Sequence, residues 1–193
     1  MSDGRIARTG NSSRTERPSP SSLLFHNSRL GGGQLFILLD SARDERIYSR
    51  LMELGEASHA RSLYQGDIGE SLAHVSPYLL ALREDLPECR WFAEAGFGQN
   101  WGLFIIAPVP FDELRRHLRK FNIVYRENGT PLVFRFYDPR VLRRFLPTCT
   151  PDELRRFFGP IESFLAETEE ADALLRFTLR GDELMRTRLA VQV

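Results

Sequence analysis

The sequence has little that would direct it to a membrane, out of the cell or onto nucleic acid. Its longest apolar run, Leu35 to Leu39, is far shorter than the roughly 20 apolar residues that span a bilayer. No apolar stretch typical of a signal peptide occurs near the N-terminus. The formal net charge is zero, from 26 basic and 26 acidic side chains, so no surplus of positive charge is present to neutralise phosphates. We therefore expect a cytoplasmic protein with no stable membrane association and no nucleic acid partner.

Residues that hold metals or form disulfides are also scarce. The two cysteines, Cys89 and Cys149, lack the C-x-x-C spacing of metal and redox sites, so we expect core residues of a reduced protein. The four histidines are scattered along the chain, without an H-x-x-x-H pair. Among them, His117 is expected on the polar face of a helix, in contact with solvent. The sequence therefore predicts no metal site.

The glycine clusters do not have the order of a nucleotide-binding loop. Such a loop follows a strand and opens a helix, so that backbone N–H groups face the phosphates. Here the glycines at 31–33 and 96–98 each precede a predicted strand instead. The nucleophile motif G-x-S-x-G is absent as well. We expect no cofactor and no enzymatic activity.

The chain divides by composition into three parts. Residues 1–33 are rich in Ser, Arg, Gly, Asn and Pro, with too few apolar groups to offset the entropy of ordering, so we expect a flexible tail. Residues 34–160 carry strand and helix patterns in turn and form the main domain. Residues 161–193 are typical of short strands with a turn near Gly181 and Asp182, and form a short C-terminal extension.

These patterns predict an α/β (α+β) fold, with a mixed sheet flanked by helices, one main lobe and the short β-rich extension. Asp40 or Ser41 is the expected N-cap of the first helix, which ends at Gly55. Asn128-Gly129 predicts a hairpin turn. Strands are expected over 35–39, 58–64, 78–82, 101–107, 123–125 and 132–137. The first of them is apolar throughout and is suited to burial on both faces. Further helices are expected from Pro87, over 111–121, from Pro139, and from Pro151, where Thr150 and Glu153 have the spacing of a capping box.

The densest motif spans residues 135–140, where the end of a strand and the start of a helix follow each other directly. Asp138 is suited to cap that helix, with Arg135 or Arg140 paired to it, which gives the motif a structural interpretation. Arg and Tyr are also favoured at protein interfaces, which gives it a functional one. Residues 111–160 hold eleven basic and six acidic side chains, so this part of a neutral chain is expected to present a positive face.

Several motifs of the main domain occur in an order found in a known family. They are Phe36 to Asp40, Gly98-Gln99, Trp101 to Phe104, Glu113 to Leu118, Phe134 to Leu142 and Phe157 to Pro160. On these residues the chain resembles the type VI secretion effector chaperones, also called adaptors, formerly described as a domain of unknown function. The likeness covers residues 34–160.

The resemblance implies a non-catalytic chaperone that binds a type VI effector, a toxin, and helps load it onto the VgrG spike protein. It also implies a second, often helical lobe, whereas the residues after 160 are typical of strands here. A chaperone of this kind shields apolar segments with an apolar groove, for which the aromatic residues at 91–101 and 134–137 are candidates. The protein-binding residues that we expect are Trp101, Arg135, Tyr137, Asp138 and Arg140.

Two other functions remain open at this point. An enzyme or anion-binding domain would use the Arg135 and Arg140 cluster in a concave pocket with a titratable partner. A nucleic-acid module would use the basic residues from Arg115 to Arg144, and its binding would weaken steeply with salt.

Overall fold

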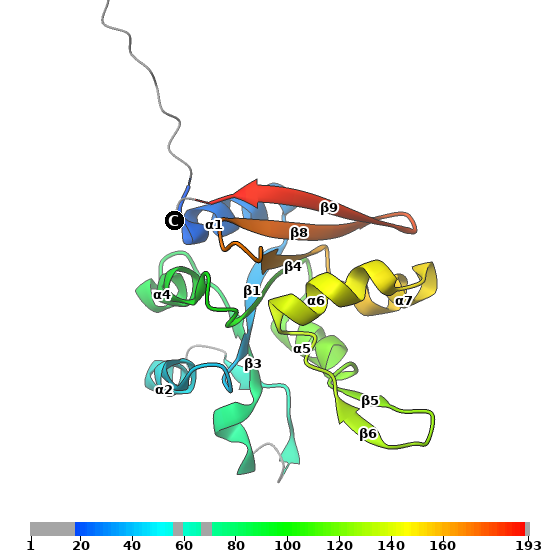
Figure 1. Cartoon of the computed structure of the whole chain (residues 1–193). Helices are drawn as coiled ribbons and strands as arrows, with labels where there is room; N and C mark the ends of the chain where they lie inside the picture. The colour runs from blue at the N-terminus through cyan, green and yellow to red at the C-terminus, as the bar shows by residue number, and fades with distance from the viewer. Residues whose placement is uncertain (1–17, 56–59, 67–70, 192–193) are drawn as a thin grey trace, which may run out of the picture.

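The computed structural model describes residues 18–55, 60–66 and 71–191. Their strands form one seven-stranded sheet, in the order β2-β3-β1-β4-β7-β8-β9, and a separate two-stranded hairpin, β5-β6 (Figure 1). The strands are β1 (Gln34–Asp40), β2 (Arg61–Ser62), β3 (Pro77–Ala81), β4 (Gly102–Ala107), β5 (Ile123–Tyr125), β6 (Pro131–Val133), β7 (Ser163–Glu167), β8 (Ala173–Arg180) and β9 (Glu183–Ala190).

Helices cover both faces of the large sheet (Figure 1). They are α1 (Pro20–Gly31), α2 (Glu45–Leu54), α4 (Pro87–Gly96), α5 (Phe111–Arg119), α6 (Pro139–Phe145) and α7 (Pro151–Phe158), with short 3-10 turns at Ala73–Val75 and Leu146–Thr148. The predicted α+β fold, with helices flanking the sheet, is confirmed. Each pairing between described strands is antiparallel.

Two apolar cores lie on opposite faces of the sheet because side chains alternate along each strand. In β1, Phe36 and Leu38 join the core beneath α5, α6 and α7. Leu35, Ile37 and Leu39 join the core beneath α1, α2 and α4. The unbroken apolar run of β1 is therefore explained by burial on both faces, as the sequence predicted.

The predicted flexible tail is wrong for the part of it that the structure describes. Residues 20–31 form α1, with Ser19 accepting a hydrogen bond from the Ser22 N–H as N-cap. Leu24 is fully buried and Phe25 is 6% exposed, in the same core as α4. Composition alone suggested disorder, but α4 and the sheet supply the apolar surface that α1 needs. Residues 1–17 lie outside the described residues.

The C-terminal strands are confirmed, with β8 and β9 joined by a turn at residues 181–182. They continue the large sheet, because β7 pairs with β4 in its centre. Residues 161–191 therefore share both cores with residues 34–160 and supply three of the seven strands.

Local capping explains where the helices begin. Asp138 accepts the Arg140 N–H at 2.9 Å to cap α6, and Thr150 forms a capping box with Glu153 at α7, both as predicted. The expected cap of α2 is wrong, because Asp44 and not Asp40 or Ser41 caps that helix. The strand expected over 58–64 is observed only at Arg61–Ser62, and residues 56–59 lie outside the described residues.

The hairpin of β5 and β6 projects away from the large sheet (Figure 1). Gly129 lies in its turn with a φ of 79°, a backbone conformation that favours glycine. The second strand is shorter than predicted, because the chain leaves it after Val133 and turns into the core at Phe136. Among the described residues, no helix combines the length and apolar character needed to cross a membrane.

Candidate protein-binding site

Four of the five expected site residues lie at the corner between β6 and α6, namely Arg135, Tyr137, Asp138 and Arg140. Trp101 precedes β4 and belongs to the core on the opposite face of the sheet. Arg135 forms an ion pair with Asp40 at the end of β1, whose side chain is only 1% exposed. Asp40 also accepts the Ala42 N–H at 3.3 Å. The ion pair joins two segments that are far apart in sequence, so it fixes this corner against the centre of the sheet.

The second ion pair of the corner is local. Arg140 Nη2 lies 2.6 Å from the Oδ2 of Asp138, and its Nε donates to the same carboxylate. Burial acts to raise the pKa of Asp138, but the hydrogen bonds from Arg140 outweigh it and hold that pKa below its ordinary value. Asp138 therefore stays ionised and caps α6.

Two of the expected residues lie inside the protein. Tyr137 is 2% exposed, and burial raises its pKa well above the ordinary range. Trp101 is 3% exposed, and its ring lies tilted at 47° against that of Trp91. The guanidinium of Arg46 lies over the Trp101 ring, 5.1 Å from its centroid. Both side chains contribute to the cores, whereas Arg135 and Arg140 keep about half of their side-chain surface exposed, at 45% and 50%. A protein-binding role for these five residues stays a prediction.

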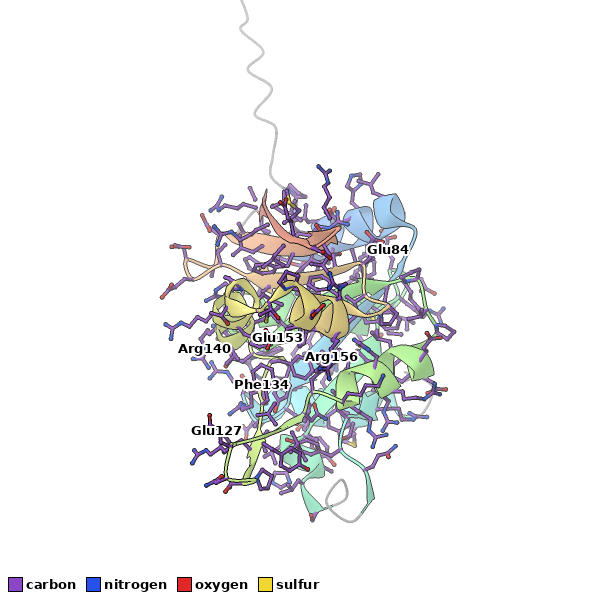
Figure 2. The ribbon with its side chains drawn as sticks, turned by 90° about the vertical axis from the view of Figure 1, so that its right-hand side faces the viewer. Glu84, Glu127, Phe134, Arg140, Glu153 and Arg156 are labelled. Atoms are coloured by element: carbon purple, nitrogen blue, oxygen red, sulfur yellow. The ribbon has the colours of Figure 1, made fainter. Side chains whose placement is uncertain are left out.

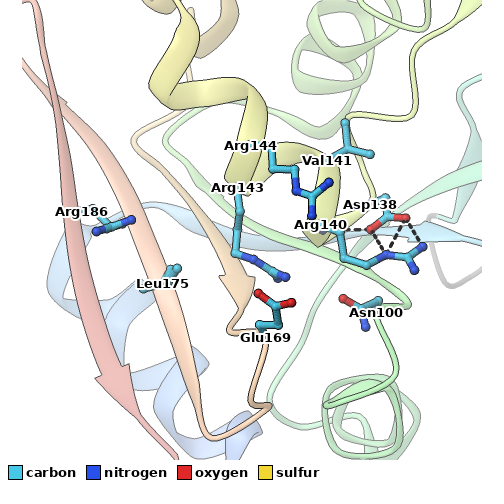
Figure 3. A pocket seen from close by; sticks show the side chains of 9 residues that line it. All are labelled: Asn100, Asp138, Arg140, Val141, Arg143, Arg144, Glu169, Leu175 and Arg186. Carbon is cyan, nitrogen blue, oxygen red and sulfur yellow. Dashed lines mark hydrogen bonds and ion pairs between the residues drawn. The ribbon is translucent and has the colours of Figure 1, made fainter.

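The corner opens onto a polar pocket between α6 and the β8–β9 strands, with a volume of about 600 Å³ (Figure 3). Its lining residues are Asn100, Asp138, Arg140, Val141, Arg143, Arg144, Glu169, Leu175 and Arg186. Asn100 reaches it from the loop before β4, with a φ of 54° that Asn tolerates better than most residues. Arg135 does not line this pocket, so the expected convergence of Arg135 and Arg140 in one concavity is not observed.

A second hollow, the aromatic groove, lies beside the hairpin and has a volume of about 440 Å³. Its lining residues are Phe121, Val124, Phe134, Phe145, Glu153, Arg156 and Phe157. Figure 2 shows Phe134 close to Glu153 and Arg156 of α7 on this side of the molecule. Rings pack edge to face along it, with centroids 4.8 Å apart for Phe134 and Phe145 and 5.2 Å apart for Phe145 and Phe157.

The hairpin beside the aromatic groove exposes apolar side chains on both of its faces. The exposed fractions are 51% for Ile123, 40% for Val124, 71% for Tyr125, 37% for Leu132 and 59% for Val133. Single exposed apolar residues are common, but five of them gather on one hairpin next to an aromatic groove, which makes this surface a candidate for binding a partner. The sequence indicates this exposure. Consecutive apolar residues in a strand point to opposite faces, and a separate two-stranded hairpin cannot bury both of its faces. The groove itself combines residues of β5, α6 and α7 with Phe121 after α5 and Phe134 after β6, and of these only Phe134 was predicted.

Two further basic residues of the middle segment, Arg115 and Arg119, have structural partners. Arg115 donates from Nε and Nη2 to the carbonyl of Ser62, at 2.9 and 2.6 Å, and Arg119 donates to that of Leu63 at 3.2 Å. These bonds hold the edge strand β2 to α5 and direct both guanidinium groups inward. A continuous basic track from Arg115 to Arg144 is therefore not formed.

His117 was expected in solvent, and that prediction is wrong. The side chain is 8% exposed and its Nε2 donates to the Phe157 carbonyl at 2.8 Å. Burial lowers the pKa of this imidazole. Within the described ranges, no three His, Cys, Asp or Glu side chains are grouped closely enough to hold a metal ion.

Comparison with known proteins places most of this architecture in a family. Residues 35–156 match the family described as a domain of unknown function, DUF4123. The match runs from β1 into α7 and includes the corner, the hairpin and the aromatic groove except Phe157. Curated proteins and solved structures gave no match. Because the matched residues make up more than half of the chain, it belongs to the DUF4123 family.

Proposed function

We propose that the protein is a non-catalytic cytoplasmic adaptor that binds a type VI secretion effector and helps load it onto the VgrG spike. The family to which it belongs is known in type VI secretion effector adaptors. The observation in this chain that carries the proposal is the aromatic groove with the exposed apolar hairpin beside it.

The groove suits an apolar segment of an effector. Its floor is aromatic, so an apolar side chain that enters it leaves water without meeting unpaired polar groups. Glu153 and Arg156 stand at its rim with opposite charges, which matches a segment whose apolar side chains are flanked by polar ones. The projecting hairpin adds further apolar surface, so that a bound segment is covered from two sides. An effector with membrane-inserting helices would be kept in solution in this way until it is loaded.

The proposal is tested by co-expressing the tagged chain with the effector and VgrG encoded beside it, followed by affinity capture. The wild-type chain is expected to retain the effector. Val124→Glu places a charge in the groove and is expected to reduce retention at least about tenfold, since an unpaired charge in an apolar contact costs more than 1.4 kcal/mol.

Met185→Glu is the matched control, because Met185 is 38% exposed on β9 and Val124 is 40% exposed on β5. It is expected to retain the effector as the wild type does. Failure of the wild-type chain to retain effector or VgrG would contradict the adaptor function. If both variants retained the effector equally well, the effector would bind at a surface other than the aromatic groove. A dimer that Val124→Glu disrupts would show that a second copy fills the groove instead.

A further inference from the structure

We propose that the arginine pocket, which is the pocket between α6 and the β8–β9 strands, binds a carboxylate-bearing segment of a protein partner. This inference does not depend on the aromatic groove. It rests on the charges that line the pocket, on the way the fold gathers them and on the apolar residues between them (Figure 3).

The positive charge of the pocket is not neutralised within the described structure. Only Arg140 has a carboxylate partner, Asp138. Arg143 donates to the backbone carbonyl of Glu167, which orients its guanidinium without neutralising it. Arg144 and Arg186 make no hydrogen bond or ion pair with any described residue. The lining holds four guanidinium groups and two carboxylates, so positive charges exceed negative ones by two.

Two different elements bring these arginines together. Residues 140, 143 and 144 lie three and four positions apart on α6, so that they share one face of the helix. Arg186 comes from β9, where it stands opposite Phe177 and on the side of the sheet that packs under α6 and α7. The two elements therefore line one pocket with four guanidinium groups, and this excess of positive charge favours an anion as the ligand.

A carboxylate ligand fits this pocket better than a nucleic acid does. Glu169 and Asp138 in the wall would repel a continuous row of phosphates, whereas carboxylates that are separated by aliphatic residues can lie away from them. Val141 and Leu175 give the pocket apolar surface that an adjoining aliphatic side chain can cover. The guanidinium fork pairs with a carboxylate through two parallel hydrogen bonds. A peptide with acidic and aliphatic residues in alternation meets all three features.

The inference is tested with the full-length chain and a short fluorescent peptide of alternating Glu and Leu, by fluorescence anisotropy at low ionic strength. We expect binding that weakens as salt is added. Arg144→Gln combined with Arg186→Gln is expected to weaken it about five- to tenfold, from the loss of two partly exposed charge contacts. Both side chains are exposed, so the double variant is expected to fold.

Arg116→Gln is the matched control, because Arg116 is also exposed but lies on α5 and does not line the pocket. It is expected to leave the affinity unchanged, as is Val124→Glu, which separates this site from the aromatic groove. A peptide in which Gln replaces Glu is expected not to bind. The inference is overturned if the acidic peptide does not bind, if the double variant binds it as the wild type does, or if a single-stranded oligonucleotide of equal charge binds more tightly at the same residues.

Discussion

Arg135 and Asp40 form an ion pair across 95 residues of sequence, between the chain leaving β6 and the end of β1. The carboxylate is buried and the guanidinium is about half exposed, so the pair is asymmetric in its contact with water. A buried carboxylate is stable only when charged or polar partners replace its hydration. Arg135 therefore has a structural role, and because its guanidinium is paired with Asp40 it is less available to bind an anion from outside the protein.

Loss of Arg135 is expected to destabilise the fold. Arg135→Ala would leave the Ala42 N–H as the hydrogen-bond donor to the Asp40 carboxylate. It should lower the free energy of unfolding by about 1–3 kcal/mol. This is less than for a fully buried ion pair, because solvent already screens the half-exposed guanidinium. Urea denaturation measures it. Arg83→Ala removes an exposed pair with Asp85 and should change much less. Equal effects would show that Asp40 does not depend on its partner.

The buried imidazole of His117 should make stability depend on pH. Burial lowers its pKa below the ordinary 6.5, so the unfolded chain binds a proton that the folded chain does not. The contribution of the neutral imidazole to stability is then fully present above pH 6.5 and is lost as the pH falls through 6.5 toward the lowered pKa of the folded state. His117→Gln keeps a donor for the Phe157 carbonyl but does not titrate. Thermal melts across this pH range should show a smaller decrease in melting temperature for the variant than for the wild type. If the melting temperatures of the two proteins fell in parallel, His117 would not be the group responsible.

Local chemistry explains which parts of the fold could be predicted. The cap at Asp138 and the capping box at Thr150 depend on neighbouring residues, so the sequence was enough to place α6 and α7. The same holds for the turn at Gly129. The run of residues 35–39 predicted a strand buried on both faces because nothing polar interrupts it.

Long-range packing explains what could not be predicted. The segment that forms α1 has few apolar residues, and Leu24 becomes buried only because α4 and the sheet, distant in sequence, lie against it. The partner of Asp40 and the carbonyl that His117 bonds are likewise remote, so both residues were placed wrongly. The aromatic groove and the arginine pocket each combine several elements, and their residues became neighbours only through the sheet order.

Gly102 is expected to be intolerant of any side chain. A Cβ at this position would overlap the Leu38 carbonyl of the adjacent strand β1, in the middle of the sheet. Gly102→Ala should lower the free energy of unfolding by at least about 2 kcal/mol, because backbone has to move to make room. In Gly31→Ala the nearest atoms to the new methyl group belong to the side-chain carboxylate of Glu162, which can move more easily than backbone, so a smaller change is expected by urea denaturation. A tolerant Gly102 would mean that β4 and β1 do not pair in this register.

The role of α1 as part of the fold gives the last prediction. Leu24 is fully buried, and Leu24→Ala should lower the free energy of unfolding by about 2–4 kcal/mol through lost burial and the cavity that remains. Leu30 lies on the same helix and is 72% exposed, so Leu30→Ala should change stability by less than about 0.5 kcal/mol. Both values follow from urea denaturation of the full chain. If the two substitutions had the same small effect, α1 would not pack on the sheet in solution, and residues 20–31 would belong to a flexible tail after all.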